Sequence, residues 1–586
     1  MKLSHYVFDF LVKKGVDTVF YLPGGGCMHL MDSLASNRDL NAFSLLHEQA
    51  VAVACESYVN TSGKTGVALV TTGPGATNTI TGMLAAYLDS SPCLFISGQV
   101  KTADLKSNFG VRSHGSQEAD IVSIVSSITK YAVMVTDKTT IRYHLERAWH
   151  EASSGRRGPV LIDIPLDIQA ADIDPASLPA FTPEEKRAEF DAASLIPYIN
   201  NARRPVIIAG NGLVKCKEAF YSMLDVLKFP VIPSWKAMDY IANDNPLYAG
   251  RAGGMGDRHG NLTMQNADLI ISLGCRLDYS ITGFDRTAWA PRAKKIIVDI
   301  DSAELAKLKN AGDTIPVHAD VELVITSLLS RKNEIHVKDI SVWKERINYW
   351  KQKYPVAVQA HADNAKLKTC AFIDALSSVL PETAHIAPCS SGTTAEIFFQ
   401  TFTVKAGQKI RSNHGLGSMG FEIPNAIGMC AASGCQNTYC VAGDGGMQLN
   451  IQELAVISAR ALPVKLFVIN NNGYASIRNM QNNHFKGRHA GCDRSSGLFL
   501  PDTKKLAAAY DIKYRSLKKP DEIEAVLRDV INTEGPVICE VFVEEECLVS
   551  PRAATIISAD GSMRSSPLEN QFPFLSEEEM RENMNH

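Results

Sequence analysis

The chain has 586 residues, which is too long for a single hydrophobic core and predicts three or four domains. Its 45% apolar and 21% charged residues are typical of a soluble globular protein, and a net charge of −4 without a basic tract argues against nucleic acid or an anionic membrane as partner. It contains no apolar segment of bilayer-spanning length and no signal-peptide pattern, so we expect a cytoplasmic protein. The 13 cysteines include no CxxC pair and no common zinc spacing, which favours reduced thiols.

Short β-rich runs alternate with helical runs along most of the chain, which predicts an α/β fold with parallel sheets. Residues 1–170 begin with an amphipathic helix ending at Gly15. A strand, a glycine turn and a helix follow in Lys64–Asn78, and a last strand in Gly158–Pro165. Residues from about 170 to 190 are rich in Pro, Ala and charge and are interpreted as a linker.

Residues 190–335 form a second α/β segment, with predicted strands in Arg203–Gly212, Asn266–Cys275 and Lys294–Asp301. Each strand ends in a polar or glycine turn. Gly210-Asn211-Gly212 is only a fragment of a dinucleotide-binding motif, and a plain turn is the favoured interpretation. A polar stretch between about 332 and 366 marks the next boundary.

Residues 366–548 repeat the pattern of the first segment. Asn437–Asn450 resembles Lys64–Asn78, and Gly535–Val543 resembles Gly158–Pro165, in the same order. We therefore predict three doubly wound parallel-sheet domains, of which the first and third are alike and the middle one is Rossmann-like. The tail, residues 549–586, is predicted to be a loop and a short acidic helix that lies over the active site or packs elsewhere.

The turn Gly443-Asp444-Gly445 and the later pair Asn470-Asn471 carry the clearest chemical signal. They follow two predicted strands that are joined by a helix, so Asp444 and Asn471 should meet at the carboxyl ends of neighbouring parallel strands. Their oxygens suit Mg²⁺, with the Gly473 carbonyl as a third ligand. The N–H groups of Gly445 and Gly446 would face a diphosphate. Alone, such a turn is more often structural; its spacing to the amide pair favours a magnesium–diphosphate site.

The matching turn of the first segment is Gly73-Pro74-Gly75, where proline replaces the metal-binding aspartate. This copy cannot bind Mg²⁺ in the same way and should serve another role. Glu48 lies nearby in sequence, where a buried strand meets an Ala-rich helix. A carboxylate at a helix start commonly stabilises the helix dipole, which is the simpler explanation for Glu48.

Several motifs together resemble those of the thiamine-diphosphate (ThDP) enzymes, in the acetolactate synthase-like branch that also includes pyruvate decarboxylase relatives. The resemblance covers residues 1 to 575. The motifs are FYLPGGG (Phe20–Gly26), LLHEQAVAVA, TTGPGATN, SGQV (Ser97–Val100), GCRLDYSITG (Gly274–Gly283) and GLGSMGFEIPNAIG.

The resemblance implies a ThDP- and Mg²⁺-dependent enzyme that decarboxylates a 2-keto acid and transfers the acyl unit to a carbonyl acceptor. Glu48 would hydrogen-bond the aminopyrimidine N1′, and the Gly417 carbonyl would accept from its 4′-amino group. Met419 would wedge under the cofactor, while Gln117 and His114 would act on the substrate. The remaining cofactor contacts would come from Gly25, Pro74, Asn78, Ser391, Gly392, Thr393, Gly443, Tyr474 and Ala475.

The resemblance also places Glu48 and Asp444 of one site on different subunits. The expected assembly is a homodimer or a dimer of dimers. Many relatives bind FAD in the middle domain, and the glycine-rich segments Ala249–Asn261 and Gly274–Gly283 leave FAD binding open here.

Three departures from the acetolactate synthase pattern concern the acceptor side. Ser280 stands where an arginine would bind the acceptor carboxylate, Met480 replaces a selecting tryptophan, and Ser116 replaces a phenylalanine before Gln117. We therefore expect pyruvate as donor and a bulkier or uncharged acceptor, such as a keto sugar. The alternatives are a simple 2-keto acid decarboxylase, a C–C hydrolase or lyase, and a non-catalytic regulatory relative.

Overall fold

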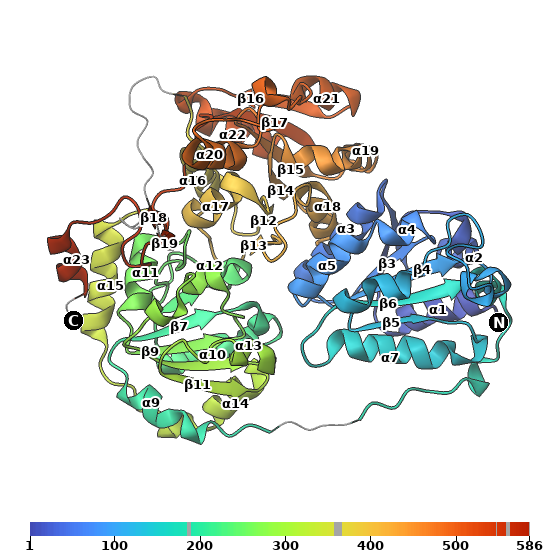
Figure 1. Cartoon of the computed structure of the whole chain (residues 1–586), viewed down its shortest axis with the longest axis horizontal. Helices are drawn as coiled ribbons and strands as arrows, with labels where there is room; N and C mark the ends of the chain where they lie inside the picture. Colours follow the sequence, from blue (N-terminus) through green and yellow to red (C-terminus); the bar gives the residue numbers. More distant parts are fainter. Residues whose placement is uncertain (185–188, 357–365, 547, 558–562, 585–586) are drawn as a thin grey trace.

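The structure, a computed structural model, describes residues 1–184, 189–356, 366–546, 548–557 and 563–584. Within these residues the strands form three all-parallel sheets and one small antiparallel pair. Figure 1 shows the three sheets well separated, each surrounded by its own helices. The predicted fold class is therefore confirmed.

The first sheet has the strand order β2-β1-β3-β4-β6-β5. Helices cover both faces, so its central strands are buried along their whole length. The strands are β1 (Thr18–Tyr21), β2 (Asn41–Ser44), β3 (Gly66–Val70), β4 (Cys93–Gln99), β5 (Tyr131–Met134) and β6 (Val160–Pro165). The α-helices are α1 (Leu3–Lys13), α2 (Met28–Ser36), α3 (Glu48–Ser62), α4 (Pro74–Thr77), α5 (Ile80–Leu88), α6 (Ile121–Val125), α7 (Ile141–Ser153) and α8 (Leu166–Ala170).

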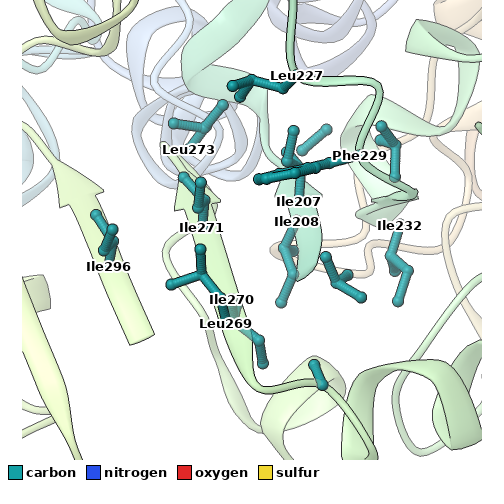
Figure 2. Packing of buried hydrophobic residues seen from close by; sticks show 14 of the residues in the cluster. Ile207, Ile208, Leu227, Phe229, Ile232, Leu269, Ile270, Ile271, Leu273 and Ile296 are labelled. Carbon is teal, nitrogen blue, oxygen red and sulfur yellow. The ribbon is translucent and has the colours of Figure 1, made fainter. Parts of the chain in front are cut away.

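The middle sheet has the order β11-β10-β9-β7-β8. Figure 2 shows part of its core, where Ile207 of β7 lies beside Phe229 and Leu273 of β9 lies near Leu227. The strands are β7 (Pro205–Ala209), β8 (Val231–Pro233), β9 (Leu269–Leu273), β10 (Lys294–Asp299) and β11 (Thr314–His318). The α-helices are α9 (Ile196–Asn201), α10 (Lys217–Leu227), α11 (Arg258–Gln265), α12 (Tyr279–Thr282), α13 (Ser302–Ala306), α14 (Val321–Ser330) and α15 (Ser341–Lys353).

The third sheet has the order β13-β12-β14-β15-β17-β16, which repeats the order of the first sheet strand for strand. The predicted likeness of the first and third domains is thus confirmed. The strands are β12 (His385–Ala387), β13 (Lys409–Ile410), β14 (Thr438–Gly443), β15 (Val464–Asn470), β16 (Lys513–Leu517) and β17 (Val537–Phe542). The α-helices are α16 (Thr369–Val379), α17 (Gly392–Thr401), α18 (Glu422–Ala432), α19 (Leu454–Ala459), α20 (Ala475–Phe485), α21 (Thr503–Ala509) and α22 (Ile523–Asn532).

The first and third domains of the chain pack directly against each other through α3 and α18, which lie side by side in Figure 1. The Ser57 hydroxyl on α3 lies 2.7 Å from the Asn425 carbonyl oxygen, to which it donates, and the two helices share one apolar cluster. This contact brings the N-terminal end of α3 toward the segment that follows β14.

The segment after β14 differs from the predicted single helix. A 3₁₀ segment, Gly446–Glu453, precedes α19, and Asn450 interrupts it with φ −136° and ψ 33°. The Asn450 amide donates to the Gly420 carbonyl at 2.8 Å, a long-range contact that local periodicity does not reveal. The chain therefore enters its helix later than the pattern of apolar residues indicates.

The described part of the tail packs on the middle domain. It comprises β18 (Thr555–Ile557), β19 (Met563–Ser565) and α23 (Glu577–Met584). The Trp350 indole N–H donates to Asn583 Oδ1 at 2.8 Å, and Arg258 donates to the Pro573 carbonyl at 2.7 Å. Among the described residues, no helix combines the length and apolar character needed to cross a membrane.

Candidate active site

Asp444 and Asn471 lie where the sequence predicts, just beyond the carboxyl ends of the paired strands β14 and β15. Both side chains are buried, with 6% and 5% of their surface exposed. Asp444 Oδ2 accepts from the Gly473 N–H at 2.9 Å. Asn471 Oδ1 is buried and has no hydrogen-bond partner among the described residues. A carboxylate beside an unsatisfied amide oxygen is a donor set that fits a hard divalent cation.

Burial raises the pKa of Asp444 to about 6, because the loss of water outweighs the backbone N–H donors and the nearby Arg478 charge. A metal ion would supply the missing positive charge. The Gly445 N–H, which we expected to face a diphosphate, instead donates to Asp444 Oδ1 at 2.8 Å. This local turn arises because an aspartate readily accepts from the backbone that follows it.

The turn after β15 requires glycine at position 473. Gly473 has φ +116°, and a Cβ there would overlap the Cys492 carbonyl oxygen. The Tyr474 ring lies against Gly445, where an added Cβ would overlap it. Ala475 begins α20. The two glycine turns and Tyr474 are therefore assembled into one unit at the edge of the sheet.

Glu48 begins α3, and its side chain reaches out of the helix. Glu48 Oε2 accepts from the Asn78 amide at 3.0 Å, and a Cβ on Gly75 would lie 3.6 Å from Glu48 Oε1. His47, the N-cap residue of α3, makes no side-chain hydrogen bond to the start of the helix. The carboxylate thus faces the Gly73–Asn78 turn, with Pro74 exposed on that turn.

Gln117 reaches the same turn through its backbone. The Thr72 hydroxyl donates to the Gln117 carbonyl at 3.1 Å, and Gly73, with φ +59°, leaves no room for a Cβ beside that carbonyl. Gln117 itself adopts φ +66° and exposes its side chain. The loop is therefore fixed against the turn at one point, while the amide group faces outward.

Glu453 links the first and third domains of one chain, and the sequence analysis missed it. It is fully buried, and its two carboxylate oxygens accept from the Leu46 N–H at 3.1 and 3.2 Å. Burial raises its pKa to about 7. The Asn450 amide also donates to Gln49 Oε1 at 3.3 Å. These contacts fasten the start of α3 to the segment that follows Asp444, and no local pattern announces them.

The Gly417 loop lies beside the start of α17. Gly417 has φ +66° and donates its N–H to the Asn413 carbonyl at 3.0 Å, and a Cβ on it would lie 3.9 Å from Ser391 Cβ. Ser391 is the N-cap residue of α17, and Gly392 and Thr393 form its first turn. Met419 is half-buried in the same loop. The structure thus brings together the predicted diphosphate and pyrimidine contacts of this domain.

His114 and Gly25 lie on exposed loops. The His114 ring stacks on Phe109 at 3.8 Å between centroids, and the His114 backbone N–H donates to Glu118 at 3.0 Å. His414 instead stacks on Trp235 at 3.7 Å, and burial lowers its pKa. Gly25 opens an exposed 3₁₀ turn.

Ser280 lies in a cavity of about 230 Å³ between the first, middle and third domains. Its hydroxyl donates to Asp278, which also forms an ion pair with Arg276 at 2.7 Å. The glycine-rich segment Gly274–Gly283 contributes to the lining, whereas Ala249–Asn261 does not. Glycines in the latter are needed by the protein's own packing, since a Cβ on Gly253 would overlap the Ser280 carbonyl.

Glu422 gives a pH-dependent stability that can be measured. It is 2% exposed, Oε2 lacks a partner among the described residues, and burial raises its pKa from 4.5 to about 7. The unfolded chain ionises first, so the folded state should lose about 3 kcal/mol of stability from this group as pH rises from 4.5 to 7. In cofactor-free protein, thermal melts should show Glu422→Gln losing less stability over this window than wild type.

The matched control is Glu577→Gln, whose side chain is 92% exposed on α23. It should follow the wild-type pH dependence. Parallel curves for wild type and Glu422→Gln would contradict the assignment.

Comparison with known proteins places these features in a family. Profiles of thiamine pyrophosphate enzymes match the chain in three parts: the N-terminal TPP binding domain at residues 1–124, the central domain at 192–328 and the C-terminal TPP binding domain at 390–541. The chain is 31% identical over 559 residues to the probable acetolactate synthase large subunit of Methanocaldococcus jannaschii, covering 93% of this chain and 92% of that protein.

Two further relatives give the same result. Identity is 30% over 566 residues to the acetolactate synthase large subunit of Lactococcus lactis, with 95% of both chains covered. It is 31% over 569 residues to the mitochondrial acetolactate synthase catalytic subunit of Saccharomyces cerevisiae, covering 93% of this chain and 81% of that protein. The chain therefore belongs to the acetolactate synthase-like family of thiamine-diphosphate-dependent enzymes, and thiamine diphosphate is its cofactor.

Proposed function

We propose that this enzyme decarboxylates a 2-keto acid, pyruvate, and transfers the acyl unit to a carbonyl acceptor with the help of Mg²⁺. The observation that carries the proposal is Asn471 Oδ1, which is buried without a hydrogen-bond partner in the described part of the chain and lies with the Asp444 carboxylate at the edge of the third sheet. ThDP, when bound, supplies the carbanion and the electron sink for decarboxylation. The protein's own groups would bind and orient the cofactor and substrate and would transfer protons to them.

Each part of the site has a distinct task in this proposal. Asp444, Asn471 and the Gly473 carbonyl would hold Mg²⁺ against the cofactor diphosphate. Glu48 would hold a proton at the aminopyrimidine N1′, and the Gly417 carbonyl would accept from the 4′-amino group. The burial of Asp444 and Asn471 supports this arrangement, because the attraction between a carboxylate and a metal ion is stronger where water is excluded.

We also propose that the functional unit is a homodimer, or a dimer of dimers, with Glu48 and Asp444 of one site on different chains. The half-buried Glu48 and the exposed Asn78 leave this edge of the first domain open to a second subunit. Leu46 of the first domain and Leu449 of the third domain are large apolar residues with 52% and 46% of their surface exposed. Separated monomers should be inactive.

The acceptor is proposed to be bulkier or uncharged next to its carbonyl, such as a keto sugar. Ser280 supplies only a hydroxyl, which is directed at Asp278, and Arg276 is paired with the same carboxylate. Ser280→Arg should raise kcat/KM for acetolactate formation from pyruvate alone on the order of tenfold, because a bidentate guanidinium would bind the second pyruvate. Ser280→Gln, which adds length without charge, should not.

The direct test combines purified protein with pyruvate, ThDP, Mg²⁺ and a panel of ketones, aldehydes and nucleotide-linked keto sugars. Carbon dioxide release and adducts would be followed by mass spectrometry. A wild-type enzyme that already makes acetolactate at the rate of a biosynthetic synthase would rule out the altered acceptor.

FAD is proposed to bind in the cavity lined by Gly274, Arg276 and Ser280. Arg156 and Lys236 on the same cavity are already paired with Asp301 and Asp89. The further basic side chains Arg157 and Lys215 in the lining support an anionic ligand there. A flavin absorbance spectrum in purified protein tests this point.

A further inference from the structure

We propose that His489 Nδ1, Cys492 Sγ and Asp493 Oδ2 bind one Zn²⁺ ion, with a water as fourth ligand. The three atoms lie within 4.8 Å of one another. His489 Nδ1 is 3.5 Å from Asp493 Oδ2, and Cys492 Sγ is 3.8 Å from the same oxygen. Tetrahedral Zn²⁺ with its usual bond lengths separates such ligands by about 3.3 to 3.8 Å. Two of the three edges therefore already have the right length.

The surroundings of His489 fix the ring in the ligating tautomer. Nε2 lies 2.7 Å from Asn482 Oδ1. If Nε2 carries the proton and donates to this oxygen, Nδ1 presents its lone pair to the cluster. Metal-bound histidines typically donate their second ring nitrogen to an oxygen in this way.

Asp493 is also oriented by a second set of contacts. Its Oδ1 accepts from the Ser495 hydroxyl at 2.7 Å and from the Ser496 N–H at 3.0 Å, which leaves Oδ2 toward the cluster. These hydrogen bonds hold the carboxylate group of Asp493 in one orientation. Cys492 is a fully buried free thiol, and binding would release its proton to solvent.

The site adjoins the proposed magnesium end without sharing a side chain with it. The Cys492 carbonyl accepts from the Tyr474 N–H at 2.8 Å. Gly473 passes close to the same carbonyl, and a Cβ on Gly473 would overlap it. Zn²⁺ would therefore hold the segment after α20 in place against the Gly473–Tyr474 turn. Sequence spacing alone did not suggest a zinc site, since the ligands are of three different types within five positions.

The test uses full-length protein with Mg²⁺ present and Co²⁺ as spectroscopic probe for Zn²⁺. Wild type should bind one equivalent of Co²⁺ with a thiolate-to-metal absorption band, and Zn²⁺ should displace it. Cys492→Ser should abolish the band. Cys435→Ser, at an exposed cysteine, should leave it unchanged. Asn482→Ala should weaken Co²⁺ binding by about 10-fold or more, as loss of an outer-shell partner does.

Two further variants test the same site independently, in case Cys492→Ser does not fold. His489→Gln alters a partly exposed ligand and should weaken binding strongly, whereas His484→Ala, at an exposed histidine of α20, should not. Zn²⁺ should also raise the melting temperature of wild type but not of His489→Gln. Absence of a thiolate band in wild type, or a band unchanged in both Cys492→Ser and His489→Gln, would overturn the proposal.

Discussion

Glu48→Gln is expected to lower turnover by about 10²- to 10⁴-fold while ThDP remains bound. Glutamine keeps the length and polarity of the side chain, so it can still pair with Asn78, but it cannot hold and release a proton at N1′. Steady-state carbon dioxide release would measure turnover. Calorimetric titration with ThDP would measure cofactor binding in the same variant.

Glu48→Asp separates this role from helix stabilisation. A charge at the start of α3 is kept, so a residue that acts only on the helix dipole would tolerate the change. A residue that must reach the cofactor would not, because aspartate is one methylene shorter. A Glu48→Asp variant with wild-type turnover would refute the proposed contact.

Asn471→Ala is expected to weaken ThDP binding in the presence of Mg²⁺ by about 100-fold, equivalent to about 3 kcal/mol, and Asp444→Ala by at least as much. Asn471 would lose the buried amide oxygen that has no other partner in the described chain. Asp444→Ala would also remove the carboxylate that accepts from Gly473. Binding would be followed by titrating ThDP at saturating Mg²⁺, and the Mg²⁺ requirement by titration at saturating ThDP.

The neighbouring amide offers a matched control. Asn470 donates to Glu540 Oε1 at 2.7 Å and accepts from the Asn472 N–H at 3.1 Å, so its side chain is engaged by the protein itself. Asn470→Ala should leave ThDP and Mg²⁺ binding within about twofold of wild type, since it removes no proposed ligand. Equal losses in Asn470→Ala and Asn471→Ala would mean that the turn, rather than a metal ligand, has been damaged.

The start of α3 was predictable from the sequence, whereas the contact of the Glu48 side chain was not. A strand followed by an Ala-rich helix predicts that Glu48 begins the helix, and the structure confirms that start. The partner of its carboxylate, Asn78, lies thirty residues away, and the sequence did not predict this pair. Backbone periodicity is local, whereas a side-chain contact depends on how two loops are packed.

The glycines of the middle domain show the opposite outcome. Ala249–Asn261 was interpreted as open enough for phosphate, yet Gly253 and Gly256 are filled by backbone of the protein itself. A glycine in a sequence indicates close approach without revealing what approaches. Only the tertiary structure identifies the neighbour.

The sequence by itself determined the three parallel sheets, the likeness of the outer two and the position of Asp444 and Asn471 at adjoining strand ends. These follow from strand periodicity, turn residues and the fixed direction of parallel strands, which are short-range rules. The tertiary structure decided the break at Asn450, the burial of Glu453 against Leu46 and the cluster around Cys492. Each of these depends on side chains that only packing brings together. Such contacts join residues at irregular positions, so they produce no repeating pattern in the sequence from which they could be predicted.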